Sequence, residues 1–527
     1  MTTAEHRWRS LLPWTALLAA SLTAVLVGAA AADPGAERPP LRLREALALG
    51  IQRNLDLRLQ EIAIPVSEQE VVAREADFDP VMEAGADTRA DKVPSAAGGG
   101  REPDLVRTTG ADVGVRKRFT TGLESRLAAE TYRRSTDDAG TALDPAYRTF
   151  LVLDLTQPLL RDRGREVNTS ALREGRNAVL QARYLHLDRA LRIGEEIELA
   201  YYDLATAHQL LAYRVEARGR AEELLAGNRE KFEAGVVPIT EVQQAETAVA
   251  ARDEQVVVAR QLADRVTTRL WDLLEIRRGD PGYGAPFVTE PLPPAPEDYP
   301  ELEEALAVAL AERPDLRERL LEVENRELRV AFSRNQTLPR LDLVATLGLN
   351  GLSGDEREGF SSDYDGRYLD SWSRLPDGDG YQWLAGARLA YPLGNRSAQA
   401  RLRQSAWEKR QAVYGLKRLE GTAEAEVERA LVDVRRGLER YRVAERFQRL
   451  AAATLSQEME RLKEGLSDTF RVLTFQDDLT EAHIRKEAAL SDSQKGLASL
   501  YRAMGKNLER HGIVAELQEK ESEREHP

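Results

Sequence analysis

The chain has 527 residues, of which 31% are charged and 6% aromatic, with a formal net charge of −14. The acidic balance, without a basic patch interleaved with aromatic residues, argues against nucleic acid as a partner. Cysteine is absent, which excludes disulfides, thiolate chemistry and Cys-ligated zinc. The six histidines are scattered, and none pairs with a carboxylate at metal-site spacing, so we expect no enzyme, no cofactor and no metal site. High charge with few aromatic residues favours long amphipathic helices.

Residues 1–32 predict a secretory signal peptide. Arg7 and Arg9 precede the apolar run LLPWTALLAASLTAVLVGAAAA, which ends in small residues before Asp33. A positive flank, an apolar middle and an Ala-x-Ala site indicate cleavage after Ala32. No later apolar run approaches the ~20 residues that a membrane-spanning helix needs. If the mature chain crosses a membrane, it must do so with strands.

The chain contains an internal duplication. EALALGIQRNLDLRLQ begins at Glu45 and EALAVALAERPDLRER begins at Glu304, and the alignment continues without a gap to Pro80 and Pro339. Pro65 in the first helical segment predicts a kink or break there. We therefore expect two structural repeats and two connecting segments: a first repeat at 41–276, a proline-rich linker at 277–300, a second repeat at 301–507, and a charged C-terminal tail at 508–527.

Each repeat is expected to continue from its opening helix into strands. Apolar and polar residues alternate after Pro80 and after Pro339, which is the period of a strand. The strands of the first repeat occupy about 80–158 and those of the second about 339–393. A further pair of alternating runs near 109–131, hinged on FTTG, has no counterpart in the second repeat.

Long helices should follow the strands, because proline is absent from long stretches of helical periodicity. Four-three spacing of apolar residues predicts coiled-coil seams, carried by Ile193, Ile197, Ala200, Leu204, Ala207 and Leu211 and by Val427, Leu431, Val434, Leu438 and Tyr441. Helices over 166–233 and 396–464 would each span ~100 Å. Two shorter helices stacked end to end, 240–276 with 301–336 and 469–506 with 41–76, would reach about the same length. The result is two antiparallel hairpins of equal height, with tips at 233–240 and 463–470.

The two tips share one motif. FEAGVVPITEVQQAE and LKEGLSDTFRVLTFQ align without a gap, and Gly235 falls on Gly465. Glycine at this place is typical of a helix C-cap, but the apolar residues after it would be exposed unless a partner covered them. We interpret the tips as docking surfaces as well as caps, formed by Gly235, Val236, Val237, Gly465, Leu466 and Ser467.

Together these features resemble the outer-membrane efflux protein family, the TolC-like channels of Gram-negative bacteria. The resemblance rests on the duplicated openings, the proline–strand junctions and the two tips, and it covers essentially the whole mature chain. It implies a mainly α fold with β, in which coiled-coil hairpins form a periplasmic α-barrel and strands form a transmembrane β-barrel completed by trimerisation. Four to six strands per chain are too few for an open barrel, and three chains would supply twelve or more.

The resemblance also implies location and partners. The protein would be a homotrimer in outer-membrane lipid, extending into the periplasm. It would serve as the exit duct of a tripartite efflux or type I secretion system, with a periplasmic adaptor (membrane fusion) protein and an inner-membrane transporter. The cargo and the transporter class stay open, and the hairpin near 109–131 could belong to the barrel, a collar or a surface loop. The rival interpretation is a periplasmic coiled-coil scaffold without channel activity.

The most detailed prediction concerns a periplasmic gate. In the family, aspartates ring the tunnel just after the second tip, at positions held here by Arg471 and Thr474, whereas the first tip keeps a carboxylate, Glu241. Asp478 lies on the helix face of Arg471, so three copies could form a cation-favouring ring. Two alternatives remain, namely that Asp478 is a solvated charge or that Arg471 pairs with Glu241 across the tips.

Aromatic residues gather near the second strand pair. Trp383 and Tyr391 fall on the apolar face of the returning strand, which makes them candidates for a membrane-interface girdle. The alternative is that these aromatic residues pack within a loop.

Overall fold

The computed structural model describes residues 40–93, 104–138, 140–280, 283–284 and 287–513. The predicted signal peptide and the tail beyond residue 513 lie outside this part of the chain. The chain divides into two compact units. We call them the helical unit, made of Met1–Ala63, Ala182–Glu318 and Lys417–Pro527, and the strand unit, made of Ile64–Gln181 and Arg319–Leu416.

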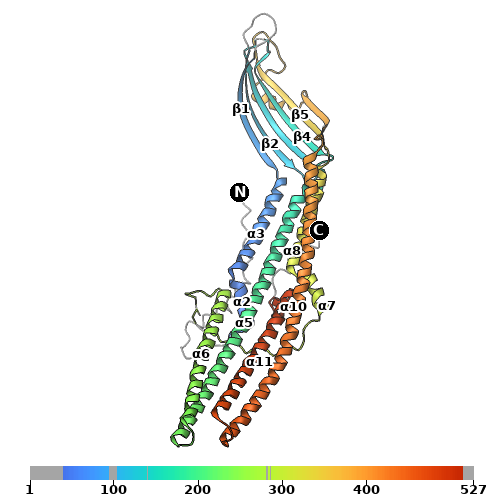
Figure 1. Cartoon of the computed structure of the whole chain (residues 1–527). Coiled ribbons are helices and arrows are strands. Elements are labelled where there is room, and N and C mark those ends of the chain that lie inside the picture. The colour runs from blue at the N-terminus through green and yellow to red at the C-terminus, as the bar shows by residue number, and fades with distance from the viewer. Residues whose placement is uncertain (1–39, 94–103, 139, 281–282, 285–286, 514–527) are drawn as a thin grey trace. The chain divides into compact units, whose positions relative to one another are not determined.

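Long helices dominate the described chain (Figure 1). Two of them, α5 and α10, have 64 and 68 residues, and each is followed by a 35-residue helix after a short turn. The helices are α2 (Leu43–Arg53), α3 (Leu55–Glu75), η1 (Ala76–Phe78), α4 (Arg165–Asn168), α5 (Ser170–Glu233), α6 (Ile239–Leu273), α7 (Leu302–Glu312), α8 (Pro314–Gln336), α9 (Tyr368–Ser373), α10 (Arg396–Lys463), α11 (Thr469–Ala503) and α12 (Asn507–Arg510). Both predicted hairpins are therefore present, as α5–α6 and α10–α11.

The opening helix of each repeat is interrupted, but the first interruption does not fall at Pro65, where the sequence predicts it. The helix α3 runs through Pro65, so the expected break there is absent. The break falls at Asn54, with φ −59° and ψ 123°, and its side-chain oxygen accepts a hydrogen bond from the amide of Leu57. Arg313 breaks the second repeat with φ −61° and ψ 124°, and Pro314 then begins α8. Side-chain capping by Asn54 therefore sets the first interruption, and a proline at the first helical position sets the second.

A six-stranded antiparallel sheet forms most of the strand unit, with the strands in chain order from β1 to β6. The strands are β1 (Val81–Val93), β2 (Asp104–Arg118), β3 (Glu124–Thr136), β4 (Leu143–Pro158), β5 (Arg340–Glu356) and β6 (Tyr381–Ala390). The hairpin predicted near 109–131 is β2–β3, turning at Gly122 with φ 92°, and it lies between β1 and β4. The sheet therefore incorporates this hairpin completely.

The register aligns side chains into rows that cross all six strands. One apolar row consists of Met82, Val115, Leu127, Leu153, Leu347 and Trp383, and a second consists of Ala84, Val113, Ala129, Leu151, Leu349 and Tyr381. Because side chains alternate along a strand, both rows lie on one face, which we call the apolar face. The opposite, polar face carries ion pairs such as Arg116–Glu83 at 2.9 Å and Arg126–Asp154 at 3.5 Å.

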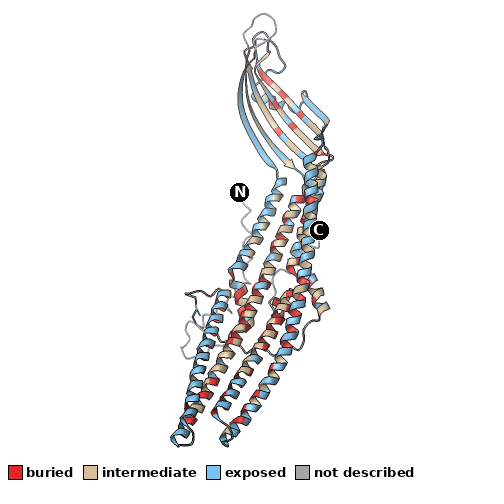
Figure 2. Cartoon of the chain, in the orientation of Figure 1, coloured by how far each residue is buried: buried red, intermediate tan, exposed pale blue. Residues whose placement is uncertain are grey.

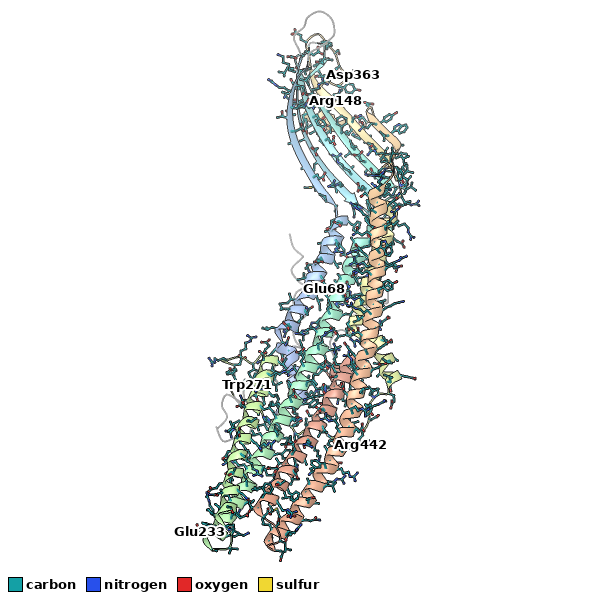
Figure 3. The ribbon with its side chains drawn as sticks, viewed as in Figure 1. Glu68, Arg148, Glu233, Trp271, Asp363 and Arg442 are labelled. Carbon is teal, nitrogen blue, oxygen red and sulfur yellow. The ribbon has the colours of Figure 1, made fainter. Side chains whose placement is uncertain are left out.

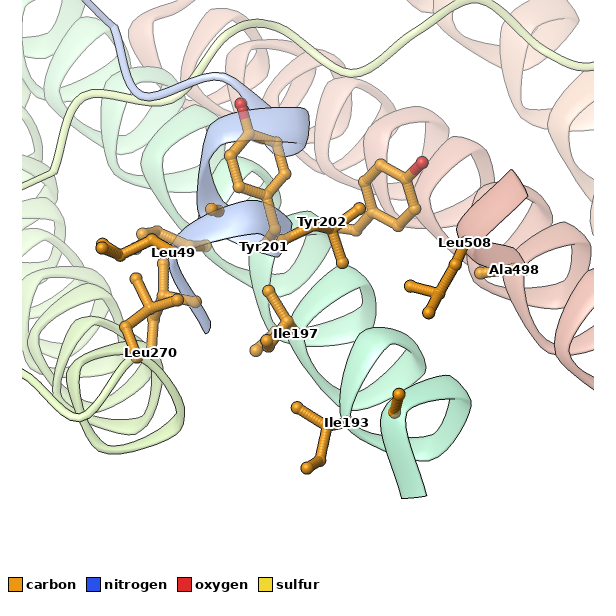
Figure 4. Packing of buried hydrophobic residues seen from close by; sticks show 14 of the residues in the cluster. Leu49, Ile193, Ile197, Tyr201, Tyr202, Leu270, Ala498 and Leu508 are labelled. Carbon is orange, nitrogen blue, oxygen red and sulfur yellow. The ribbon is translucent and has the colours of Figure 1, made fainter. Parts of the chain in front are cut away.

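Buried residues gather where helices of the helical unit lie side by side, whereas the sheet is largely exposed or half-buried (Figure 2). The largest cluster packs α2 against α5 and α6, and its members include Ile193, Ile197 and Leu270 (Figure 4). A second cluster packs α7 against α10 and α11, and includes Val427 and Val434. Most of the predicted seam residues therefore lie in the core of the helical unit, whereas Leu211 and Tyr441 are half-buried.

Candidate functional site

The tips of the two helical hairpins have the same backbone geometry. Gly235 and Gly465 each have φ 73°, in the left-handed region that favours glycine. In each tip the glycine amide donates to the carbonyl three residues back, and the next amide donates to the carbonyl five residues back. This is the Schellman motif, which satisfies the last carbonyls of a helix. Glu233 marks the end of α5 at the first tip in Figure 3.

Apolar side chains project from both tips. Val236 is 71% exposed, Leu466 is 68% exposed and Phe470, which was not predicted, is 65% exposed. The other predicted docking residues are less free, because Val237 and Ser467 are half-buried and the Ser467 hydroxyl donates to Glu458. Exposed apolar side chains at the end of a hairpin are available for contact with another protein.

Buried polar contacts join the first tip to the second. The side-chain amide of Asn228 donates to the Thr469 hydroxyl at 2.9 Å and to the carbonyl of Glu241 at 3.2 Å. The Glu241 carboxylate accepts a hydrogen bond from the amide of Thr469 at 3.2 Å. Thr469 is the first residue of α11, so Glu241 satisfies an amide that the helix leaves free and places negative charge at its positive end.

A buried arginine links α6 to α11. The side chain of Arg252 is 3% exposed and lies 2.8 Å from the carboxylate of Asp477, which is 62% exposed. Its guanidinium also donates to the carbonyls of Leu473 and Ala248, each at 3.4 Å. Burial lowers the pKa of Arg252 and Asp477 opposes this shift, but an arginine stays protonated in a protein. The buried guanidinium of Arg252 on α6 therefore has one strong partner, the carboxylate of Asp477 on α11.

Arg471 does not pair with Glu241 in this structure. Its Nε lies 3.5 Å from the carboxylate of Glu458, a side chain that is nearly fully buried. Arg461 lies 3.4 Å from the same carboxylate. Glu458 therefore holds the second tip together from within its own hairpin, and Glu241 is occupied at Thr469. This geometry corrects the cross-tip pair that the sequence offered as an alternative.

Asp478 is exposed on α11, as are Arg471 and Thr474. Within the described residues, its carboxylate has no ion-pair or hydrogen-bond partner. The exposures agree with the shared helix face expected from spacing.

The candidate girdle residues lie at the edge strand. Trp383 is 70% exposed in β6 and stands opposite Leu347 on the apolar face. Tyr391 is exposed and lies just after the end of β6. Tyr368, in the connection between β5 and β6, belongs to α9, and its ring contacts the ring of Tyr147. Only part of the aromatic cluster is therefore free to face a membrane.

No described helix is long and apolar enough to cross a membrane. No group of three or more histidine, aspartate or glutamate side chains among the described residues is placed to hold a metal ion.

Comparison with known proteins identifies the second repeat. Residues 305–506 match the family model described as outer membrane efflux protein. The chain carries an outer membrane efflux protein domain. This domain covers α10, α11, β5 and β6, together with the second tip, and it confirms the family resemblance for the second repeat. A comparison with curated proteins gave no match.

Solved structures of outer-membrane channels share the fold. The CmeC channel of Campylobacter jejuni is 17% identical with a TM-score of 0.59, over 90% of this chain and 91% of that chain. VceC of Vibrio cholerae is 14% identical with a TM-score of 0.60, over 88% and 96%. The open-state MtrE channel of Neisseria gonorrhoeae is 16% identical with a TM-score of 0.58, over 89% of each. The predicted fold class, mainly helical with strands and built of long hairpins, is confirmed.

Proposed function

We propose that this efflux protein is a homotrimeric exit duct in the outer membrane of a Gram-negative bacterium. It receives substrate from an inner-membrane transporter and a periplasmic adaptor, in a tripartite efflux or type I secretion system. The strand unit lies in outer-membrane lipid and the helical hairpins extend into the periplasm. Family membership and channel-like fold support this assignment, and neither suggests an enzyme.

The observation that carries the proposal is the two-faced sheet with unpaired edges. An exposed apolar face crossing six strands suits lipid on that side, and a face of paired charges suits water on the other. Within the described residues, β1 and β6 each have a neighbour on one side only. Free strand edges in a lipid environment need partners, because no water there satisfies their backbone groups. Neighbouring copies supply them.

The tips are the proposed docking surface for the adaptor. Gly235, Val236, Val237, Gly465, Leu466 and Ser467 form the predicted set, to which the exposed Phe470 is added. Replacement of Gly235 and Gly465 by tryptophan should reduce export without changing trimer level or outer-membrane location. Normal export by the double variant would show that the adaptor binds elsewhere.

The contacts between α6 and α11 are the proposed closed-state gate. Arg252–Asp477 and Asn228–Glu241–Thr469 hold one hairpin against the other. Asp478, two helical turns beyond Arg471, is the proposed cation-binding position. Asp478→Ala should weaken cation selectivity and block by trivalent cations in planar bilayers; unchanged block would assign Asp478 to the solvated charges.

Membrane fractionation tests the proposed function against the scaffold alternative. We expect the mature protein in outer-membrane fractions, with chemical cross-linking that captures trimers and heat-modifiable migration on gels. A scaffold would appear in the soluble periplasmic fraction. Recovery of only soluble monomers or dimers would overturn the channel proposal.

A further inference from the structure

The β2–β3 hairpin is an integral part of the sheet rather than an appendage. Thirteen residue pairs join β1 to β2 and thirteen join β2 to β3, with no shift of register in either ladder. Removal of β2 and β3 would leave β1 without its hydrogen-bonding neighbour. Each copy therefore contributes six strands, two of which are absent from the second repeat.

The hairpin strands have the same two faces as the rest of the sheet. Val115 and Leu127 occupy the apolar row between Met82 and Leu153, and they are exposed. On the other face, Arg126 joins Asp154 of β4 to Glu130 of its own strand. A collar or surface loop would not need an exposed apolar row in register with the other strands. The same lipid and the same water therefore face all six strands.

Within the described connection from β5 to β6, Tyr364, Arg374 and Asp379 line a pocket with Arg148 and Phe150 of the polar face, whereas the helix α9 lies away from that face. The helix α9 packs where Thr149 and Gly351 stand opposite each other, and the Ser371 hydroxyl lies 2.7 Å from that of Thr149. A Cβ on Gly351 would lie 1.8 Å from the carbonyl oxygen of Ser371, so this glycine permits the contact. Thr149 shares its face with Leu151 and Leu153, so α9 lies on the apolar face.

We propose that three copies close an eighteen-stranded barrel, wide enough for a cargo of polypeptide size; this inference rests on the trimeric channel proposed above. Strands ~4.8 Å apart and tilted by ~40° give eighteen strands a backbone diameter of ~36 Å. Side chains extending ~5 Å from each wall leave a lumen of ~25 Å, as in porins of that strand number. An α-helix with its side chains is about 10–12 Å wide, so a helical hairpin fits.

Several charges of the polar face form ion pairs with one another, whereas Asp87 and Asp112 on the same face have no ion pair among the described residues. Arg116 pairs with Glu83, and Arg126 pairs with both Glu130 and Asp154. The Thr346 hydroxyl donates to Asp154 at 2.7 Å. Paired charges produce weak fields beyond their immediate neighbourhood, especially in salt.

Engineered disulfides test whether the hairpin lies in the assembled sheet. The natural chain has no cysteine, so every cross-link arises from the introduced pair. Ala86→Cys with Ala111→Cys joins β1 to β2, and Ala129→Cys with Leu151→Cys joins β3 to β4, at directly opposed positions. Ala86→Cys with Ala129→Cys, on strands that are not neighbours, is the control. We expect intrachain disulfides in the first two variants and none in the control.

Labelling from outside intact cells measures the lumen. Thr346→Cys places a thiol on the polar face, and Leu347→Cys places one on the apolar face of the same strand as a matched control. Polyethylene glycol maleimides of increasing mass should label only Thr346→Cys, up to a hydrodynamic diameter of about 25 Å. A cut-off near 10 Å, or no labelling in a membrane-inserted trimer, overturns the wide barrel.

The outcomes separate the two proposals. If the protein is neither trimeric nor in the outer membrane, the proposed function itself fails. If a trimer is present in the outer membrane but the β1–β2 and β3–β4 disulfides do not form, the trimeric channel stands and the eighteen-stranded barrel is wrong.

Discussion

Removal of the Asp477 charge should release α6 from α11. Arg252 is almost fully buried, and apart from the Asp477 carboxylate its acceptors are the carbonyls of Ala248 and Leu473, each at 3.4 Å. Asp477→Ala leaves a buried guanidinium without its anionic partner, which in a fully buried pair costs about 3–5 kcal/mol. Asp477 is more than half exposed, so solvent screens the pair, and we expect about 1–2 kcal/mol.

That free energy translates into a measurable change of gating. A loss of ~1.4 kcal/mol changes an equilibrium tenfold, so Asp477→Ala should raise the open probability about tenfold at low initial opening. The assay is single-channel recording of the purified protein in planar bilayers. Glu439→Ala is the control, because Glu439 forms an exposed i,i+3 pair with Arg436 within the single helix α10.

A double-mutant cycle with Arg252→Met isolates the pair. Arg252→Met removes the buried charge and keeps an unbranched apolar chain, so the double variant should differ from Arg252→Met alone by much less than Asp477→Ala differs from wild type. We expect a coupling free energy of about 1–2 kcal/mol. If the effects are additive and Asp477→Ala opens the channel less than twofold, the pair does not hold the hairpins together.

Three further predictions concern the tips and the helical unit. Gly465→Ala should destabilise the protein by about 1–2 kcal/mol in thermal unfolding, since an added Cβ meets no atom within 4 Å and only the left-handed backbone opposes it; Gly219→Ala, inside α5, should be neutral or stabilising by up to ~1 kcal/mol. Val236→Asp with Leu466→Asp should abolish adaptor pull-down while trimer yield is unchanged, and retained binding would refute docking through these side chains. Burial lowers the pKa of His483 below its ordinary 6.5, so the unfolded chain binds the proton more tightly and stability should fall as pH drops below about 6.5; His483→Gln should flatten the dependence of the unfolding midpoint on pH, and an unchanged slope would exclude this histidine.

Local signals in the sequence were sufficient for most of the fold. Glycine at 235 and 465, with helical periodicity on both sides, located both tips because only a left-handed residue ends a helix in this way. The break at Asn54 was missed although Pro314 marks it in the second repeat, at the position after Arg313. A proline inside a helix costs a hydrogen bond but is tolerated, so Pro65 was the weaker signal.

The contacts of the candidate site depend on residues distant in sequence. Arg252 and Asp477 are separated by 225 positions, and no pattern in either segment indicates that they meet. The role of Glu458 was equally hard to predict from the sequence, because a glutamate in a helix normally faces solvent. In the folded tip its carboxylate is buried and accepts a hydrogen bond from Ser467. Sequence periodicity predicts which face of a helix is buried, but the partner helix and its axial position come from the packed hairpins.

The interruptions at Asn54 and Arg313 have a bearing on how the molecule evolved. Their backbone angles agree within two degrees, yet Asn54 caps the next helix with its own side chain, whereas Arg313 forms ion pairs with Asp315 and Glu426. A shared ancestor therefore passed on a backbone shape that each copy later secured with different chemistry. Each residue suits the contacts of its own repeat, so an exchange of Asn54 and Arg313 would place both in surroundings that do not match their side chains. The bend is common to both repeats, and the side-chain interactions that stabilise it are not.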